Sequence, residues 1–275
     1  MNSESDRRIG LLAGAGDIPV YFARKAHQNG IRLVSVGFSS EIQSLLAPYS
    51  EKSYSIGVGR WSKISQTLKD ENIQDLLILG KVDKSVIFRP QLFDLRSLKF
   101  LKNIITREDK TLLLGVIQEM AKDGFCVLDQ REFLMEIFPH EGVLSKRQPT
   151  QEEMQEVAFG FPIAKKLADM EIGQTLVVKN KTVIAVEAIE GTDRAIERGC
   201  KLAKDNAVVI KVSRTGQDYR YDCPGIGPQT LEGIAKGGAR VLALEADRIL
   251  LVEQTRVIEI ADRAGIAVVS YRLPQ

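Results

Sequence analysis

Residues 9–19 read IGLLAGAGDIP, a short apolar run that ends in two closely spaced glycines and an aspartate. The segment Ile9–Gly14 has the length and apolarity of a buried strand, and Asp17 is predicted to cap the helix that follows. A glycine-rich loop between a strand and a helix presents bare backbone N–H groups and the positive end of the helix dipole to an anion. We therefore predict that Gly14, Gly16 and Asp17 bind a phosphate group of a ligand.

This loop departs from the known nucleotide fingerprints. Dinucleotide enzymes carry a third glycine where this chain has Pro19, and an acidic residue at the end of the second strand, where residues 36–40 read VGFSS. The chain also lacks a GxxxxGK[ST] loop. These departures argue against NAD and favour phosphate or nucleotide binding of another style. The alternative, that the glycines only allow the chain to turn, stays open.

Strands and helices alternate through the first half. Apolar runs near 31–36, 54–56 and 76–80 are separated by amphipathic helices, which predicts a Rossmann-like parallel sheet. Ligands bind at the carboxyl ends of such strands. Lys81 follows one of these strands and is predicted to bind substrate. Arg107, Asp109 and Thr111, at the start of a predicted helix, are predicted to bind substrate as well. For Lys81 and Arg107, a solvated surface charge is the alternative.

The second half has its own α/β pattern. Residues 139–150 hold two prolines and mixed charges and are predicted to link a domain at 1–138 to a domain at 151–275. The segment Thr150–Glu153 reads as a capping box that opens a helix, and residues 175–188 read as a hairpin. Further strands and helices follow, so the fold class is α/β with two domains, the second of mixed α/β type.

Composition limits the classes of function. The 275 residues include 38 basic and 36 acidic side chains, a net charge of +2 that gives no nucleic-acid footprint. No apolar run reaches the roughly 18 residues of a membrane helix. Three distant cysteines argue against a disulfide framework and favour a cytoplasmic location, and two histidines argue against a zinc site.

Two acidic turns in the second half predict a cation site. Glu190 and Asp193 follow a strand, and Asp222 lies in residues 217–227, a loop that Pro224 restricts. Magnesium takes one or two carboxylates and completes its shell with water and substrate phosphates. The two turns therefore suggest metal-assisted phosphoryl chemistry. For each aspartate alone, a helix cap or a turn is the alternative.

Several segments, in order and spacing, resemble one family. They are GLLAGAGDIP at 10–19, GKV at 80–82, REDKTLL at 107–113, AVEAIEGTD at 185–193 and QDYRYDCPGIGPQT at 217–230. Together they resemble the UDP-2,3-diacylglucosamine pyrophosphatases of the LpxI type over nearly the whole chain. Tyr221 and Cys223 depart from the residues more usual in the family, and neither change affects a carboxylate.

The resemblance implies a reaction and a place. It implies metal-assisted attack of water on the pyrophosphate of UDP-2,3-diacylglucosamine, with Mg²⁺ or another divalent cation as cofactor and UMP and 2,3-diacylglucosamine 1-phosphate (lipid X) as products. The step belongs to lipid A biosynthesis at the inner face of the inner membrane, so the resemblance implies peripheral membrane contact. The N-terminal domain would bind the nucleotide and the C-terminal domain the acylated sugar phosphate.

The resemblance also assigns roles within the motifs. It places the catalytic aspartate at Asp222. Beside the resemblance, we name Asp218, four residues earlier, as the rival catalytic residue and Arg220 as a group that Asp218 would orient. We also predict that Gly191 and Thr192 bind substrate. The candidate metal ligands are Asp222, Glu190 and Asp193.

Two other functions stay open beside the leading one. The first is a different nucleotide-sugar transferase or oxidoreductase that uses the glycine loop. The second is a non-catalytic nucleotide- or nucleotide-sugar-binding regulator. The rigid loop at Asp222 favours an enzyme, because a regulator needs no fixed carboxylate there. The expected partner is a lipid-linked nucleotide sugar, without nucleic acid, and a homodimer stays open as the oligomeric state.

Overall fold

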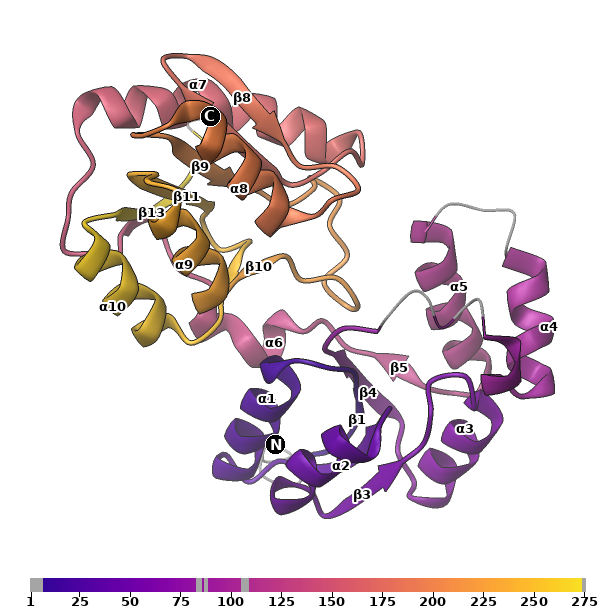
Figure 1. The fold of residues 1–275 in the computed structure, drawn as a ribbon. Coiled ribbons are helices and arrows are strands. Elements are labelled where there is room, and N and C mark those ends of the chain that lie inside the picture. The colour runs from indigo at the N-terminus through magenta and orange to yellow at the C-terminus, as the bar shows by residue number, and fades with distance from the viewer. Residues whose placement is uncertain (1–6, 83–85, 87–88, 105–108, 274–275) are drawn as a thin grey trace. The chain divides into compact units, whose positions relative to one another are not determined.

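The structure, a computed structural model, describes residues 7–82, 86, 89–104 and 109–273. Contacts divide the chain into two compact units (Figure 1). Unit 1 comprises Met1–Phe133 together with Tyr219–Tyr221, and unit 2 comprises Leu134–Asp218 and Asp222–Gln275.

Unit 1 contains a five-stranded sheet in the order β3-β2-β1-β4-β5, and every pair of neighbours is parallel. The predicted Rossmann-like sheet is therefore confirmed. The strand order reverses between β1 and β4, which are hydrogen-bonded neighbours. The strands are β1 (Arg8–Ala13), β2 (Arg32–Gly37), β3 (Lys52–Ser55), β4 (Asp75–Leu79) and β5 (Cys126–Val127).

Helices connect these strands and bury both faces of the sheet. Right-handed crossovers place the helices before and after the reversal on opposite faces. Apolar side chains of α3 and α5 pack with β1, β2 and β4 in one cluster, which includes Leu12, Ile64 and Met120. The helices of unit 1 are α1 (Asp17–Gln28), α2 (Ser40–Leu46), η2 (Ala47–Tyr49), α3 (Trp61–Asp70), η4 (Pro90–Leu92), α4 (Leu95–Ile104) and α5 (Asp109–Lys122), and α6 (Arg131–Leu134) spans the division between the units.

Unit 2 contains a six-stranded mixed sheet in the order β6-β13-β11-β9-β7-β8. The three central strands β9, β11 and β13 are parallel, and both edges are antiparallel. The predicted hairpin is confirmed as β7 and β8. The strands are β6 (Gly142–Val143), β7 (Thr175–Lys179), β8 (Thr182–Val186), β9 (Val208–Lys211), β11 (Val241–Glu245) and β13 (Ala267–Tyr271), with β10 (Gly225–Ile226) and β12 (Leu250–Leu251) as a separate parallel pair.

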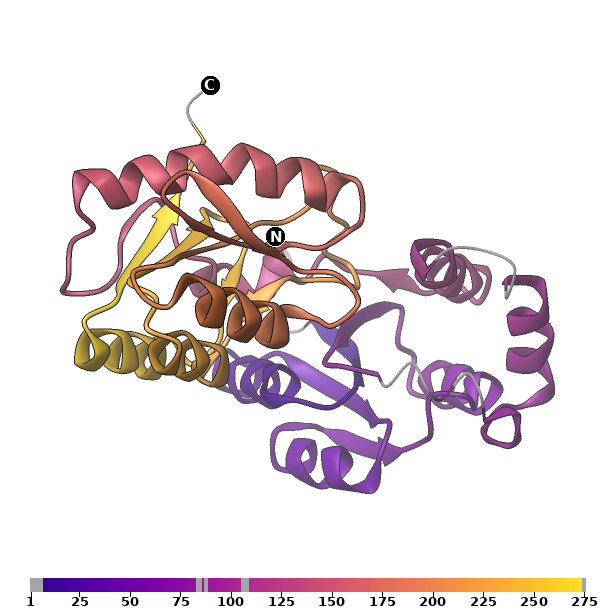
Figure 2. The ribbon, with the colours of Figure 1, turned by 45° about the horizontal axis from the view of Figure 1, so that its top comes forward.

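Helices cover this sheet on both faces, as Figure 2 shows. One face packs against α7 through a cluster that includes Phe161 and Ala164, and the other packs against α8, α9 and α10. Thr150 and Glu153 form the predicted capping box of α7. The helices of unit 2 are η5 (Met135–Ile137), α7 (Gln151–Asp169), α8 (Thr192–Ala203), α9 (Pro228–Lys236) and α10 (Gln254–Ala264).

The segment expected to be a linker takes part in the fold of unit 2. Within residues 139–150, β6 pairs antiparallel with β13, and the amide of Leu144 donates to the carbonyl of Val268 at 2.8 Å. The contacts divide the chain after Phe133. The assignment of a nucleotide to 1–138 and of an acylated sugar phosphate to 151–275 stays a prediction.

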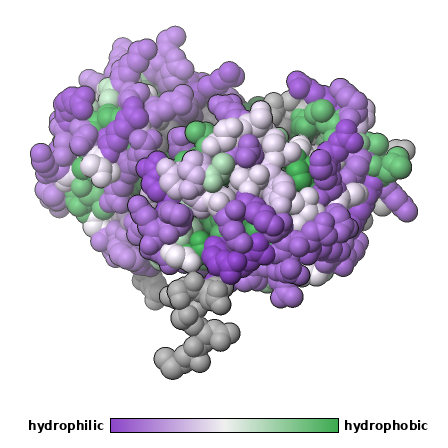
Figure 3. All heavy atoms as spheres, turned by 90° about the horizontal axis from the view of Figure 1, so that it is seen from below, coloured by the Kyte–Doolittle hydropathy of each residue, from purple (hydrophilic) through white to green (hydrophobic). Residues whose placement is uncertain are grey.

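Apolar residues are scattered over the one face of the molecule that Figure 3 draws. On the face drawn in Figure 3, hydrophilic and near-neutral residues predominate, and apolar residues form small separate areas. Across the described part of the chain, no helix combines the length and apolarity that a bilayer crossing requires.

A buried carboxylate ties two strands of unit 1 to the end of α3. The side chain of Glu71 is 9% exposed and accepts hydrogen bonds from Lys52 Nζ at 2.8 Å, Tyr54 Oη at 2.6 Å and Arg8 Nη2 at 3.0 Å. The hydrogen bonds from Lys52 and Tyr54 outweigh burial and lower the pKa of Glu71 from 4.5 to about 2.

Acid titration of Glu71 is expected to destabilise unit 1. Because its pKa is lower in the folded state, ionised Glu71 stabilises the fold above pH 4.5, and this contribution is lost as the pH falls from 4.5 towards 2. Urea unfolding followed by the fluorescence of Trp61, the only tryptophan, should show a steeper loss of unfolding free energy in the wild type than in Glu71→Gln. Glu41→Gln, at an exposed position of α2, is the matched control and should keep the wild-type slope. Parallel curves for wild type and Glu71→Gln would contradict the assignment.

Candidate functional site

The structure brings together two loops of unit 1 that the sequence separates by more than sixty residues. The amide of Gly14 donates to the carbonyl of Leu79 at 2.8 Å. Ala15 and Lys81 exchange both backbone hydrogen bonds, each at 2.8 Å, in an isolated bridge. The glycine loop after β1 and the Lys81 segment after β4 are thus joined where the strand order reverses, the place at which α/β sheets bind ligands.

The two glycines of this loop are required for different reasons. A Cβ on Gly14 would lie 2.4 Å from the carbonyl oxygen of Lys81, so only glycine allows the close approach. Gly16 has open space around it but a φ of +106°, which other residues rarely adopt. Gly16 is the N-cap of α1 and no described side chain caps the helix, so the expected capping by Asp17 is not found. The first N–H groups of α1 therefore have no side-chain acceptor in the described chain.

The third group of predicted binding residues is only partly described. Arg107 lies outside the described residues. Asp109 and Thr111 belong to the first turn of α5, and the described part of the chain does not extend to their side chains.

Unit 2 repeats the uncapped helix start at Gly191. This glycine is the N-cap of α8, has a φ of +82°, and again no described side chain caps the helix. The next residue is fixed from both sides: Thr192 Oγ1 donates to Glu187 Oε1 at 2.8 Å and accepts from Lys211 Nζ at 2.7 Å. The predicted binding residues Gly191 and Thr192 are therefore held in one place.

Lys211, which contacts Thr192 of this turn, was not predicted from the sequence. Lys211 is 4% exposed and also donates to Thr175 Oγ1 at 3.0 Å and to Glu187 Oε2 at 3.2 Å, so all three ammonium protons have acceptors. Burial lowers the pKa of Lys211, and the charge of Glu187 opposes this effect. Burial raises the pKa of Glu187, but the attraction of Lys211 and the hydrogen bonds from both threonines leave it below 4.5. A lysine inside the apolar run VVIKV at 208–212 was the available signal.

Asp222 has one oxygen fixed and one oxygen available. Its Oδ2 accepts from Arg214 Nη2 at 2.6 Å and from Gln217 Nε2 at 2.7 Å. Its Oδ1 accepts no hydrogen bond from the part of the chain that the structure describes, and the side chain is 42% exposed. Such a carboxylate is oriented by the protein while one oxygen can accept a proton or contact a ligand. The sequence analysis named neither Arg214 nor Gln217 as a site residue.

The loop that carries Asp222 is held just after Asp222 by contacts with Leu250. The carbonyl of Pro224 accepts from the amide of Leu250 at 3.0 Å, and a Cβ on Gly225 would lie 2.4 Å from the Leu250 side chain. The other two predicted catalytic residues, Asp218 and Arg220, are half-buried in the same loop, and the amide of Asp222 donates to the carbonyl of Asp218 at 3.2 Å.

The carboxylates predicted as metal ligands bond to different partners. Glu190 accepts from the Arg198 guanidinium, and this hydrogen bond lowers the pKa of Glu190. Asp193 accepts from Thr230 Oγ1 at 2.8 Å, whereas Asp222 is bound as above. Within the described ranges, no group of three or more His, Cys, Asp or Glu side chains could hold a metal ion. The described donors therefore do not fit a preformed metal centre.

A cavity of about 490 Å³ in unit 1 lies away from these groups. It is lined by Arg7, Asn29 and Ile31 among others, which mark the amino ends of β1 and β2. Because ligands of α/β sheets bind at the carboxyl ends of strands, the glycine loop is the better candidate.

Comparisons with known proteins match the chain along nearly its whole length. The family model described as the LpxI N-terminal domain matches residues 8–137, and that described as the LpxI C-terminal domain matches residues 140–269. A protein of Caulobacter vibrioides named UDP-2,3-diacylglucosamine pyrophosphatase LpxI is 30% identical over 273 residues, which cover 95% of this chain and 96% of that protein.

Solved structures give weaker likenesses. The biotin carboxylase subunit of pyruvate carboxylase aligns at 14% identity with a TM-score of 0.26, over 71% of this chain and 41% of that chain. The biotin carboxylase domain of 2-oxoglutarate carboxylase from Hydrogenobacter thermophilus aligns at 15% identity with a TM-score of 0.22, with the same coverage. Similarity at this level supports no statement about function.

Gly14→Ala should destabilise unit 1 because its Cβ would overlap the carbonyl oxygen of Lys81. Overpacking of this kind costs about 1–3 kcal/mol, measured as unfolding free energy by urea titration of Trp61 fluorescence. Gly57→Ala is the control, since a Cβ at this exposed position meets nothing within 4 Å. Equal stability of the two variants would show that the loop yields without cost.

Proposed function

Because the chain belongs to the LpxI family, we propose that it is a hydrolase that cleaves the pyrophosphate bond of UDP-2,3-diacylglucosamine, in lipid A biosynthesis. The observation that carries this proposal is the match over 95% of the chain to a relative named for that activity. The oxidoreductase alternative lacks the third glycine and the ribose acid, and the regulator alternative gives no reason for an oriented carboxylate at Asp222.

The mechanism predicted from the sequence is corrected. Metal-assisted attack of water on phosphorus, as predicted, conflicts with the mechanism of the LpxI enzymes, the family to which the C-terminal domain match and the Caulobacter relative assign the chain. In addition, the described carboxylates expected to bind the metal do not form one group. The cofactor prediction, Mg²⁺ or another divalent cation, is a separate statement that stays a prediction.

In each unit, a helix N-terminus that no described side chain caps is a candidate anion-binding site. In unit 1, Gly14 and Gly16 bring bare backbone to the N-terminus of α1, beside the exposed side chain of Lys81. In unit 2, Gly191 and Thr192 do the same for α8. Helix N-termini bind phosphate through free N–H groups and the helix dipole. These features support binding of a phosphate group in each unit. The assignment of the nucleotide to unit 1 and of the acylated sugar phosphate to unit 2 is part of the proposal.

Asp222 is the proposed catalytic residue. Hydrolysis forms a bond from a water oxygen to phosphorus and breaks the bond from that phosphorus to the bridging oxygen, and the water must lose a proton. A carboxylate with one oxygen fixed by Arg214 and Gln217 presents the other in a constant direction, which suits a general base at Oδ1. Asp218 and Arg220 stay candidates for supporting roles in the same loop.

The substrate also sets the expected location. Its acyl chains belong to a membrane surface, so the proposed function includes peripheral contact with the inner face of the inner membrane from the cytoplasm. The homodimer stays a prediction.

The reaction and the residue are tested together. Phosphorus NMR of the purified protein with UDP-2,3-diacylglucosamine and Mg²⁺ should show pyrophosphate signals replaced by phosphomonoester signals. Asp222→Asn should lower kcat by about 100- to 10,000-fold, the usual effect of losing a general base, and should keep its fold and its affinity for substrate. Asp218→Asn, the matched control four residues earlier, should lose less.

Circular dichroism and substrate titration separate a catalytic loss from misfolding. If Asp222→Asn turns over near the wild-type rate, Asp222 is not the base. If the wild-type protein leaves the pyrophosphate intact, the proposed reaction itself is wrong.

A further inference from the structure

We propose that Arg214 is a positioning residue that orients the Asp222 carboxylate, and that a partly buried charged cluster of Lys165, Glu245 and Arg248 fixes the backbone of Arg214. This inference rests on the proposed role of Asp222. Arg214 and the cluster lie outside the loop motif at residues 217–230.

The Arg214 side chain connects two groups at once. Its Nη2 donates to Asp222 Oδ2 at 2.6 Å, and its Nε donates to Gln217 Oε1 at 3.1 Å. Gln217 in turn donates from Nε2 to the same Asp222 oxygen at 2.7 Å, and also to the Asp222 carbonyl at 2.8 Å. The three side chains form a closed ring of hydrogen bonds, so the carboxylate cannot rotate without breaking two of them.

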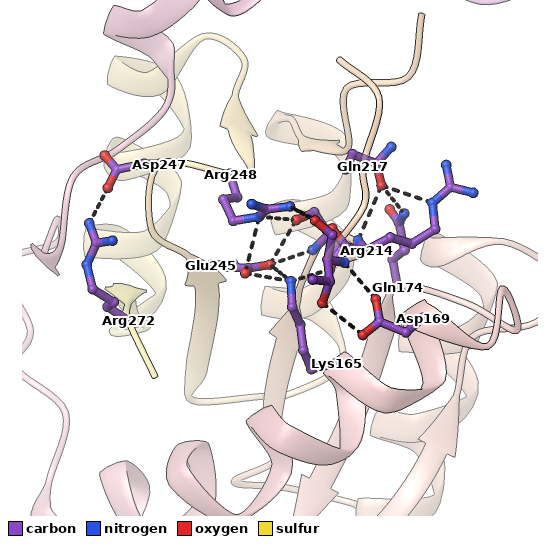
Figure 4. A network of polar contacts seen from close by, with 11 residues as sticks. Lys165, Asp169, Gln174, Arg214, Gln217, Glu245, Asp247, Arg248 and Arg272 are labelled. Atoms are coloured by element: carbon purple, nitrogen blue, oxygen red, sulfur yellow. Dashed lines mark hydrogen bonds and ion pairs between the residues drawn. The ribbon is translucent and has the colours of Figure 1, made fainter. Parts of the chain in front are cut away.

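The third guanidinium nitrogen of Arg214 faces a carboxylate of the protein. Arg214 Nη1 lies 3.5 Å from Glu171 Oε1, and the Arg214 side chain is only 18% exposed. Gln217 Oε1 also accepts from Gln174 Nε2 at 3.1 Å (Figure 4). Because these groups satisfy one another, Arg214 acts through Asp222 and does not need to contact substrate.

The cluster of Lys165, Glu245 and Arg248 holds the backbone around Arg214 through hydrogen bonds, which Figure 4 shows. Glu245 accepts from Lys165 Nζ at 2.7 and 3.0 Å, and from the amide and hydroxyl of Ser213 at 2.8 and 3.0 Å. Arg248 Nη2 donates to the carbonyls of Arg214 at 2.6 Å and of the following Thr215 at 3.1 Å.

Side chains of α7 hold the residues on both sides of Arg214. Lys165 Nζ donates to the carbonyl of Ser213 at 2.7 Å, and Asp169 accepts from the amide and hydroxyl of Thr215 at 2.6 and 2.9 Å. Both ends of Lys165–Asp169 on α7 thereby hold the chain on either side of Arg214. Charged side chains half or more buried are costly unless every partner is present, so this segment has few alternative arrangements.

A double-mutant cycle tests the proposal in the full-length protein. Arg214→Gln should lower kcat by about 10- to 100-fold, as expected for a misplaced catalytic group, with little change in KM. In the Asp222→Asn background, the same substitution should leave the residual kcat within about twofold, because there is no base left to orient. Arg214→Lys should recover only part of the loss, since an ammonium lacks the planar fork of the guanidinium.

Two further variants separate positioning from stability. Arg248→Gln should lower kcat in the same direction as Arg214→Gln and by a smaller factor, again only when Asp222 is present. Arg272→Gln removes an ion pair with Asp247 of the same unit, also drawn in Figure 4, and should leave kcat unchanged.

The outcomes divide cleanly. Equal losses from Arg214→Gln in both backgrounds, a rise in KM alone, or no loss of kcat would overturn the positioning role. If Arg214→Gln does not fold, the Arg248→Gln cycle decides by the same criterion. A wild-type protein without turnover would instead refute the proposed function, so the two failures are distinguishable.

Discussion

Helices pack on both faces of the two large sheets, so the charged groups of the candidate site lie at the ends of strands or in the loops that follow them. The interiors of β1, β9 and β11 are at most 1% exposed up to their last residues. Polar side chains enter where the strands end, as Lys211 at the end of β9 and Glu245 at the end of β11. The same rule of α/β sheets brings the Gly14 loop and Lys81 together after β1 and β4.

Burial of charge at these strand ends explains why the groups around them are so fixed. Removing an ammonium or a carboxylate from water costs several kcal/mol, which only a full set of partners offsets. Lys211 has three acceptors. Glu245 accepts hydrogen bonds from Lys165 and Ser213 and forms an ion pair with Arg248. Buried ion pairs of this kind add little net stability compared with apolar packing. Their effect is on geometry: Lys211 and Glu187 hold the side chain of Thr192, and Arg248 holds the backbone of Arg214.

The sequence predicted the parts of the fold that local rules determine. Alternating strands and helices, the hairpin and the Thr150–Glu153 capping box follow from periodicity and capping within a few residues. The glycine loop was recognised because its composition is local too. The Arg214–Asp222 pair and the Lys165–Glu245 pair were not, because partners 8 and 80 residues apart meet only once strand register and helix packing are set. For the same reason residues 139–150 gave no sign that β6 joins the sheet.

The two units share one local feature, a helix that begins at a glycine with positive φ. Gly16 and Gly191 both adopt positive φ, both precede a helix, and no described side chain caps either helix. Neither helix start supplies a proton acceptor, since N–H groups only donate. Asp222 is the proposed proton acceptor, because Arg214 and Gln217 bind Oδ2 and no group in the described part of the chain donates a hydrogen bond to Oδ1.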